Sequence, residues 1–269
     1  MFRKLYYSLS PNGRRFIRRV YYLPADFISL FDKNRDKLIP SKGKTNVGRG
    51  DFKKIGDKFF NDIVDTCKLT PEAKILDVGS GIGRIARPFT KFLNKDGNYL
   101  GFDIIKSDIE WCAKKYSQCK NFVFNHYPIK NDLYLPNANI SPEEFEFPFK
   151  EESFDVVIVI SVFTHMQFCA IENYLKEIAK VLKPQGTCYT SWFLAEADKT
   201  YELFPFIYDK YCLHNSKIKN ANVALIRNQL LQILKTNGLE IVEEKQGWWK
   251  TGISEKAFDF QDILVLKKV

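Results

Sequence analysis

The chain has 269 residues, of which 45% are hydrophobic, enough for one α/β domain with additions. No run approaches the roughly 18 consecutive apolar residues of a membrane-spanning helix, and the opening residues lack the pattern of a secretory signal. The six cysteines form no C-x-x-C pair and have no histidine at zinc spacing. We therefore expect a cytoplasmic protein without a bound metal.

The net charge of +9 is concentrated at the N-terminus. Residues 1–50 contain 12 Lys/Arg and 3 Asp/Glu, so this segment carries the whole excess and residues 51–269 are balanced. We predict a basic, aromatic extension over residues 1–50 and a main domain over residues 51–269. A neutral main domain argues against nucleic acid as the partner.

The extension is predicted to form a helix from about Pro11. Arginines would cover one side and apolar residues the other: Arg14, Arg15, Arg18 and Arg19 against Phe16, Ile17, Val20 and Tyr21. We favour a helix docked on its own domain with the arginines in water. Two alternatives stay open: peripheral contact of residues 1–40 with an anionic membrane surface, and nucleic-acid binding.

In the main domain, short apolar runs alternate with helical patterns, which predicts a mainly parallel sheet. An amphipathic helix over residues 51–67 comes first. The predicted strands are 74–78, 99–104, 121–125, 156–160, 187–193, 239–244 and 262–266. The predicted helices between them are 84–94, 107–116, 170–182 and 223–237, the second starting at a capping box of Ser107 and Glu110.

Two long connections, near residues 127–150 and 195–222, interrupt this alternation. Long connections in a compact domain are usually functional or disordered. The second contains five Phe and Tyr residues, which argues against disorder. It either covers the substrate as a lid or packs as a local pair of helices.

The most informative motif lies at the end of the first predicted strand. Residues 75–83 read Ile-Leu-Asp-Val-Gly-Ser-Gly-Ile-Gly, and Asp103 ends the next strand. Glycine lets the backbone approach a ligand closely, and the helix that follows points its free N–H groups at that ligand. Because Asp103 is placed to accept hydrogen bonds from ribose hydroxyls, the pair predicts a nucleoside-binding crevice at the carboxyl edge of the sheet.

The spacing of the glycines narrows the choice of nucleoside. It is G-x-G-x-G, whereas the dinucleotide fingerprint is G-x-G-x-x-G. Asp77 beside the loop disfavours a pyrophosphate and suits a ligand with an ammonium group. Over residues 51–269 the chain thus resembles the class I S-adenosylmethionine-dependent methyltransferases, whose motif I is D-x-G-x-G-x-G.

That resemblance implies a Rossmann-like, doubly wound α/β fold. Its seven-stranded sheet would be mostly parallel, in the order 3-2-1-4-5-7-6, with the last strand antiparallel and helices on both faces. It also implies S-adenosyl-L-methionine as the cofactor. The residues implied to bind it are Asp77 on the amino group, Gly79, Ser80, Gly81 and Gly83 in the loop, Asp103 on the ribose, Ile104 against the adenine, and Ser161 after strand four.

One position departs from the family pattern. Many relatives carry an acid just after strand three to bind the adenine amino group, and this chain has Asn125 there. We assign the same contact to the side-chain oxygen of Asn125.

The resemblance leaves the acceptor open. A hydroxyl must lose its proton, and histidine has a suitable pKa for accepting it. His165 directly follows strand four, where the methyl group is expected, whereas His126 follows strand three and His214 lies in the second long connection. We predict His165 as a base or acceptor-orienting group; the alternative is a histidine bonded to backbone at a helix start.

The predicted function is methyl transfer to a small organic acceptor, with a hydroxyl oxygen as the expected atom. An RNA or other macromolecular acceptor is one alternative, with the basic extension as the holding surface. A non-catalytic cofactor-binding module is the other. Neither the acceptor nor the oligomeric state follows from the sequence.

Overall fold

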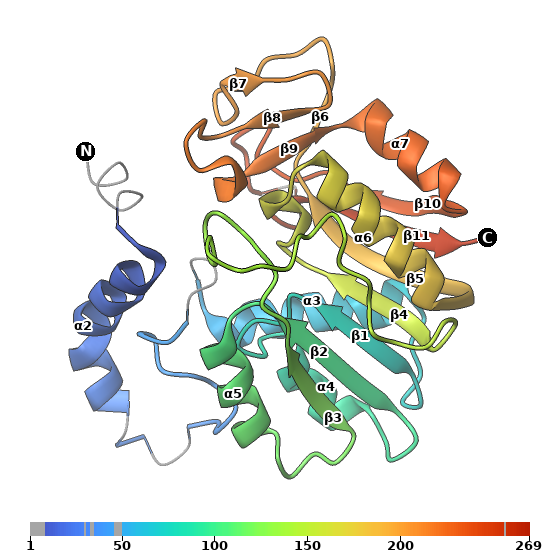
Figure 1. Cartoon of the computed structure of the whole chain (residues 1–269). Coiled ribbons are helices and arrows are strands. Elements are labelled where there is room, and N and C mark those ends of the chain that lie inside the picture. The colour runs from blue at the N-terminus through green and yellow to red at the C-terminus, as the bar shows by residue number, and fades with distance from the viewer. Residues whose placement is uncertain (1–8, 30, 33–34, 46–49, 256) are drawn as a thin grey trace.

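A seven-stranded sheet in the order β10-β11-β5-β4-β1-β2-β3 forms the centre of the computed structural model, which describes residues 9–29, 31–32, 35–45, 50–255 and 257–269 (Figure 1). The strands are β1 (Lys74–Val78), β2 (Asn98–Asp103), β3 (Phe122–His126), β4 (Phe154–Val159), β5 (Leu182–Trp192), β10 (Leu239–Lys245) and β11 (Asp262–Lys268). Strands β1 to β5 pair in parallel, and β11 is antiparallel to both its neighbours. The predicted Rossmann-like order is confirmed.

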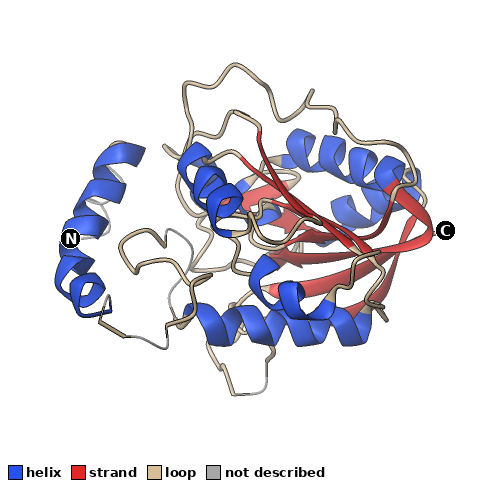
Figure 2. Ribbon diagram, turned by 90° about the horizontal axis from the view of Figure 1, so that it is seen from below, coloured by secondary structure: helices blue, strands red, loops and turns tan. Residues whose placement is uncertain are grey.

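Successive residues of the central strands point into two different cores. Leu76 and Val157 pack on one face, whereas Ile75 and Val156 pack on the other. Helices cover both faces (Figure 2): α3 (Phe52–Thr66), α4 (Ala86–Phe92) and α5 (Lys106–Lys115) on one, α6 (Phe168–Val181) and α7 (Arg227–Thr236) on the other. Burial on both faces explains why these strands are apolar without alternation.

Three local predictions are wrong. The predicted helix over 223–237 opens with a strand, β9 (Val223–Ile226), and α7 begins only at Arg227. All four residues of β9 are buried, and a short apolar run does not distinguish a strand from a helix. Strand β5 begins earlier than predicted, at Leu182, so the turn-like residues 183–186 lie inside it, with Gln185 at φ +64°.

The third wrong prediction is the capping box at Ser107. Helix α5 starts at Lys106, and its N-cap residue, Ile105, makes no side-chain cap. Instead, the backbone N–H of Ile105 donates to Oδ1 of Asp103 at 2.8 Å. An acid from the end of β2 therefore takes the place of the predicted cap.

The second long connection does not form a pair of helices, and its role as a lid stays a prediction. It contributes to a small sheet in the order β6-β9-β8-β7, together with a turn of 3₁₀ helix, η2. These elements are β6 (Leu194–Ala195), β7 (Phe206–Ile207), β8 (Tyr211–Leu213) and η2 (Lys219–Ala221). Phe193, Phe204 and Trp249 form part of its own core. Two of the five aromatic residues of this connection, Tyr201 and Phe204, thus pack in the core of a subsidiary sheet.

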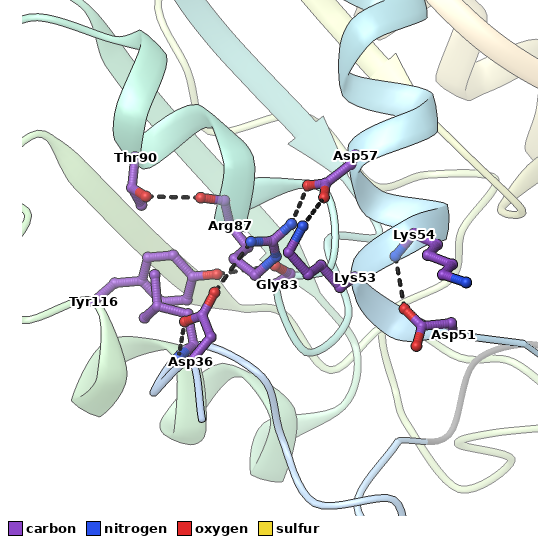
Figure 3. A network of polar contacts seen from close by, with 10 residues as sticks. Asp36, Asp51, Lys53, Lys54, Asp57, Gly83, Arg87, Thr90 and Tyr116 are labelled. Carbon is purple, nitrogen blue, oxygen red and sulfur yellow. Dashed lines mark hydrogen bonds and ion pairs between the residues drawn. The ribbon is translucent and has the colours of Figure 1, made fainter. Parts of the chain in front are cut away.

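The extension forms a long helix, α2 (Pro11–Ser29), which stands apart from the helices that cover the sheet in both views (Figures 1 and 2). The segment after it is tied to the domain through Arg87 of α4 (Figure 3), which pairs with Asp57 of α3 and, at 3.1 Å, with Asp36. Residues 1–8, 30, 33–34 and 46–49 of the predicted extension lie outside the described residues.

The orientation of α2 is opposite to the favoured prediction. Arg14 is buried against the domain, while Phe16, Tyr21 and Ile28 are 68%, 74% and 72% exposed. The arginine side therefore faces inward and the apolar side outward. Among the described helices, none combines the length and the apolar content needed to cross a bilayer.

Candidate active site

A cavity of about 670 Å³, called the main cavity below, lies at the carboxyl ends of β1, β2 and β4. Six of the predicted site residues line it: Gly79, Gly81, Asp103, Ile104, Ser161 and His165. The volume is in the range of sites that enclose a small molecule. Its position is the crevice in which parallel α/β sheets bind ligands.

The glycine loop follows β1 and folds back on β2. The N–H groups of Gly79 and Ser80 both donate to the carbonyl of Phe102, at 2.9 and 3.0 Å. Gly79 has φ +73°, and a Cβ there would lie 2.3 Å from Cγ2 of Val162. The loop therefore requires glycine at this position, because its backbone passes close to the side chain of Val162.

Gly83 serves packing instead of lining the main cavity. A Cβ at Gly83 would lie 2.9 Å from the hydroxyl of Tyr116, at the end of α5. That hydroxyl donates to the Gly83 carbonyl at 2.9 Å. The third glycine thus allows the start of the α4 segment to pack closely against α5.

Asp103 closes the loop through both oxygens of its carboxylate. Oδ2 accepts a hydrogen bond from the N–H of Gly81 at 2.8 Å, and Oδ1 accepts one from Ile105 at 2.8 Å. Burial raises the pKa of Asp103, while these backbone donors and the charge of Arg15 lower it. Because each carboxylate oxygen has a second lone pair, Asp103 keeps capacity to accept hydrogen bonds from ligand hydroxyls.

Asp77 lies in a side pocket of about 30 Å³ that shares Gly79, Gly81 and Arg84 with the main cavity. Burial raises the pKa of Asp77 to about 7, although the hydroxyl of Tyr99 donates a hydrogen bond to it and Arg84 also lowers it. Ser80 lines the same pocket, and its buried hydroxyl has no hydrogen-bond partner among the described residues. A buried acid beside an unpartnered hydroxyl suits a polar, cationic ligand group.

His165 ends a turn of 3₁₀ helix, η1 (Phe163–His165), after β4. Its Nδ1 donates to the carbonyl oxygen of Asn220 at 2.9 Å. A carbonyl only accepts, so Nδ1 carries the proton of the neutral ring and Nε2 keeps a free lone pair. Burial lowers the pKa of His165 below 6.5, while Asp132 and the backbone at Asn220 and Ala221 raise it. The ring is therefore neutral at pH 7.

Ser161 links the end of β4 to the neighbouring strands. Its N–H donates to Oγ of Ser191 at 2.7 Å, and its Oγ donates to Oε1 of Gln261 at 3.1 Å. Ser161 has φ +58°, a left-handed conformation that costs energy for a residue with a side chain. Such strain is concentrated at ligand sites.

Three residues considered in the sequence lie away from the main cavity. Asn125 sits in β3 in register with Phe102 and is not part of the cavity wall, so its contact with an adenine stays a prediction. Nε2 of His126 donates to the carbonyl of Ile104 at 3.2 Å, and Nδ1 of His214 donates to that of Leu203 at 2.7 Å. Neither histidine lines the cavity.

Several wall residues were missed in the sequence. They come from α2, the loop after β1, the first long connection and η2: Arg14, Arg15, Arg18, Arg84, Asn131 and Asn220. Of these residues, only Arg84 had a signal in the sequence, because it is a basic residue directly after the glycine motif. The others reach the cavity through long-range contacts that no local pattern encodes.

Comparison with known proteins agrees with this geometry. A family model for a methyltransferase domain matches residues 76–190. The ubiquinone/menaquinone biosynthesis C-methyltransferase UbiE of Wigglesworthia glossinidia brevipalpis is 32% identical over 158 residues, which are 58% of this chain and 56% of that protein. The sterol 24-C-methyltransferase of Schizosaccharomyces pombe is 29% identical over 118 residues, 44% of this chain and 27% of that one.

Residues 76–190 therefore carry a methyltransferase domain, and the predicted resemblance to the class I S-adenosylmethionine-dependent methyltransferases is confirmed. The chain spans about half, or less, of the length of these two curated relatives. Solved structures share the fold: the 1,6-didemethyltoxoflavin-N1-methyltransferase of Burkholderia thailandensis, with bound S-adenosylhomocysteine, has a TM-score of 0.54 at 15% identity, covering 97% of this chain and 91% of its own. The cyclase SpnF has a TM-score of 0.56 at 16% identity, covering 83% and 85%.

S-adenosylmethionine is the cofactor of this family, and the wall of the methyltransferase domain fits it. Gly79 and Gly81 present backbone without side chains to the main cavity, so a ligand can approach the main chain there. The unpartnered hydroxyl of Ser80 and the carboxyl of Asp77 lie in the side pocket, where they suit the amino-acid end. Asp103 offers acceptor oxygens at the end of β2, where they suit the ribose.

Proposed function

We propose that this protein transfers a methyl group from S-adenosylmethionine to a hydroxyl oxygen of a small organic acceptor held in the main cavity. The observation that carries the proposal is the state of His165. Its Nδ1 proton is held by Asn220, its Nε2 is free of a proton at pH 7, and the residue lines the same cavity as Gly79 and Asp103. This combination suits a general base.

The residues of the chain would have the following roles in binding and catalysis. When bound, the cofactor supplies an electrophilic methyl group on a positively charged sulfur. Asp103 and the glycine loop hold the nucleoside, and Asp77 holds the amino group. His165 accepts the hydroxyl proton at Nε2 as the acceptor oxygen bonds to the methyl carbon and the carbon–sulfur bond breaks. The cavity wall fixes the line of approach.

A small acceptor is favoured over a macromolecule by the enclosure of the main cavity. Its wall includes the first long connection and α2 as well as the sheet edge. Relatives differ in acceptor: besides the quinone and sterol C-methyltransferases, a tRNA N(3)-cytidine methyltransferase of Xenopus tropicalis is 24% identical over 116 residues. RNA is therefore the competing acceptor class in the test.

The test is transfer of labelled methyl groups from S-adenosylmethionine to a small-molecule extract or to total RNA. We expect label in a low-molecular-mass product and none in RNA, and the mass spectrum of the product should place the methyl group on oxygen. Label in RNA, with RNA binding that weakens steeply with salt, would contradict the proposal. So would tight binding of S-adenosylhomocysteine without transfer to anything, since that result indicates a non-catalytic module.

We further propose that α2 contacts a lipid surface through its outward side. Seven apolar residues of this helix are more than half exposed: Phe16, Ile17, Val20, Tyr21, Leu23, Phe27 and Ile28. Exposed cations lie nearby in the sequence, at Lys42 and Lys44. An apolar helix side flanked by positive charge suits an anionic bilayer surface. The predicted cytoplasmic location stays a prediction.

Replacing the two most exposed apolar residues should abolish this contact. We expect Tyr21→Ser with Ile28→Ser to reduce co-sedimentation with anionic vesicles about tenfold or more, because burying one large apolar side chain contributes roughly 1.5–3 kcal/mol. Ile253→Ser is the matched control, since Ile253 is 60% exposed outside α2. Equal pelleting of all three proteins, or self-association of the wild type without vesicles, would rule out the lipid contact.

A further inference from the structure

The inward side of α2 presents positive charge to the main cavity. Arg14, Arg15 and Arg18 are spaced so that they share one side of the helix, and all three line the cavity. The guanidinium of Arg14 donates to the carbonyl of Leu133 in the first long connection, which fixes the helix against the cavity wall. Figure 1 shows this connection, in green, on the side of the domain toward α2.

Arg15 and Arg18 form no ion pair with a carboxylate within 4 Å in the part of the chain that the structure describes. Arg18 stacks over the ring of Tyr22 at 5.0 Å, and its buried Nε has no hydrogen-bond partner there. Arg15 is close enough to Asp103 to lower the pKa of that acid. Asp103 accepts hydrogen bonds from the N–H groups of Gly81 and Ile105, and in the described residues it forms no ion pair with Arg15 within 4 Å.

Partly buried arginines without a carboxylate partner are unusual, since charge that leaves water is normally paired. Guanidinium groups bind carboxylates and phosphates through paired N–H donors, and two such groups on one helix side form a fork for an oxyanion. The remaining acids of the cavity wall do not supply that partner: Asp259, for example, pairs with Lys58 at 3.4 Å.

We propose that the methyl acceptor carries a phosphate or carboxylate group, and that Arg15 and Arg18 bind this group at the part of the cavity wall that α2 forms. This inference rests on the proposed function, because it describes the acceptor of that reaction. The anionic end would lie against α2 and the hydroxyl to be methylated would lie toward His165. The same oxyanion could belong to a soluble metabolite or to a lipid headgroup, and the experiment separates these sources.

The first measurement is calorimetric titration of inorganic phosphate into the full chain saturated with S-adenosylhomocysteine. We expect saturable binding by the wild type and at least about a tenfold weakening in the double variant Arg15→Gln/Arg18→Gln, since charge-assisted bonds are lost. Arg19→Gln is the control for losing a positive charge from this helix: it removes one such charge, but Arg19 is exposed and does not line the cavity. Its phosphate affinity should equal that of the wild type.

A second arm uses vesicles of phosphatidylcholine with and without phosphatidic acid. Phosphate binding in solution, lost only in the double variant, supports a soluble anionic acceptor. A preference for phosphatidic acid that is lost in the double variant and kept in Arg19→Gln supports a lipid headgroup. Absence of both effects would overturn the proposal. The double variant Arg15→Lys/Arg18→Lys, which keeps the charges without the forks, should bind phosphate at intermediate strength.

The affinity for S-adenosylhomocysteine separates this inference from the proposed function. The double Gln variant should bind it within about twofold of the wild type, because Asp103 and the glycine loop are intact. If that affinity falls as far as the phosphate affinity, the arginines serve the cofactor and the inference is wrong. If the wild type binds no S-adenosylhomocysteine, the proposed function fails, while phosphate titration of the free protein still tests the arginines.

Discussion

Replacing Asp103 with alanine should weaken the binding of S-adenosylhomocysteine about a hundredfold. The change removes the acceptor oxygens at the end of β2 that suit ribose hydroxyls, and hydrogen bonds to a charged group contribute roughly 1.5–3 kcal/mol each. It also removes the acceptor for the N–H of Gly81, so the loop loses the bond that shapes it. Calorimetric titration measures the affinity directly.

The controls separate ligand loss from unfolding. Asp103→Ala leaves two buried N–H groups without a partner, at Gly81 and Ile105, and this costs stability on its own. Asp103→Asn keeps one amide oxygen as an acceptor and should unfold at a higher temperature than the alanine variant while still binding weakly. Glu143→Gln, an exposed acid on the cavity wall, should leave the affinity unchanged. An unaltered affinity in Asp103→Ala would exclude the ribose contact.

Replacing His165 with glutamine should lower turnover by about two to four orders of magnitude, the range that a positioned general base contributes. Glutamine keeps a polar side chain of similar reach but accepts no proton near pH 7. The affinity for S-adenosylhomocysteine should not change, because the loss concerns the acceptor proton alone. Initial rates of labelled methyl transfer at saturating cofactor measure the effect.

The pH profile gives an independent check on His165. Burial lowers its pKa, so the neutral, basic form persists at pH values below the ordinary 6.5. Turnover should therefore stay high through pH 6.5 and fall only at more acidic pH, as His165 gains a proton. The glutamine variant should lack this acidic limb. If the wild-type rate already falls as the pH is lowered toward 7, or if the glutamine variant keeps the acidic limb, another group accepts the proton.

Much of the nucleoside site could be predicted because its determinants are local. Asp77 is the last residue but one of β1 and Asp103 ends β2, and parallel pairing of these strands brings their carboxyl ends together. The strand order followed from the family resemblance. By contrast, Asn220 lies 55 residues from His165, and no periodicity connects the two positions. The tautomer of the base was therefore visible only in the folded chain.

The extension shows a different limit of sequence reasoning. Periodicity established that α2 has an arginine side and an apolar side, but it did not establish which side faces the domain. The hydrophobic effect alone favours burial of the apolar side. In the fold, α2 lies against the rim of the main cavity, and Arg14 donates a hydrogen bond to a backbone carbonyl there. The identity of the facing surface, which is non-local, decides the orientation.

The bond that sets the protonation of His165 comes from a peptide group, and this affects how the protein tolerates change. A substitution at position 220 leaves the backbone carbonyl in place. Substitutions in that turn therefore preserve the tautomer of His165 that has its proton on Nδ1. A deletion or insertion between β8 and β9 would shift the carbonyl and free the ring to take the other tautomer. Substitutions between β8 and β9 are therefore tolerated, whereas the length of this connection is constrained.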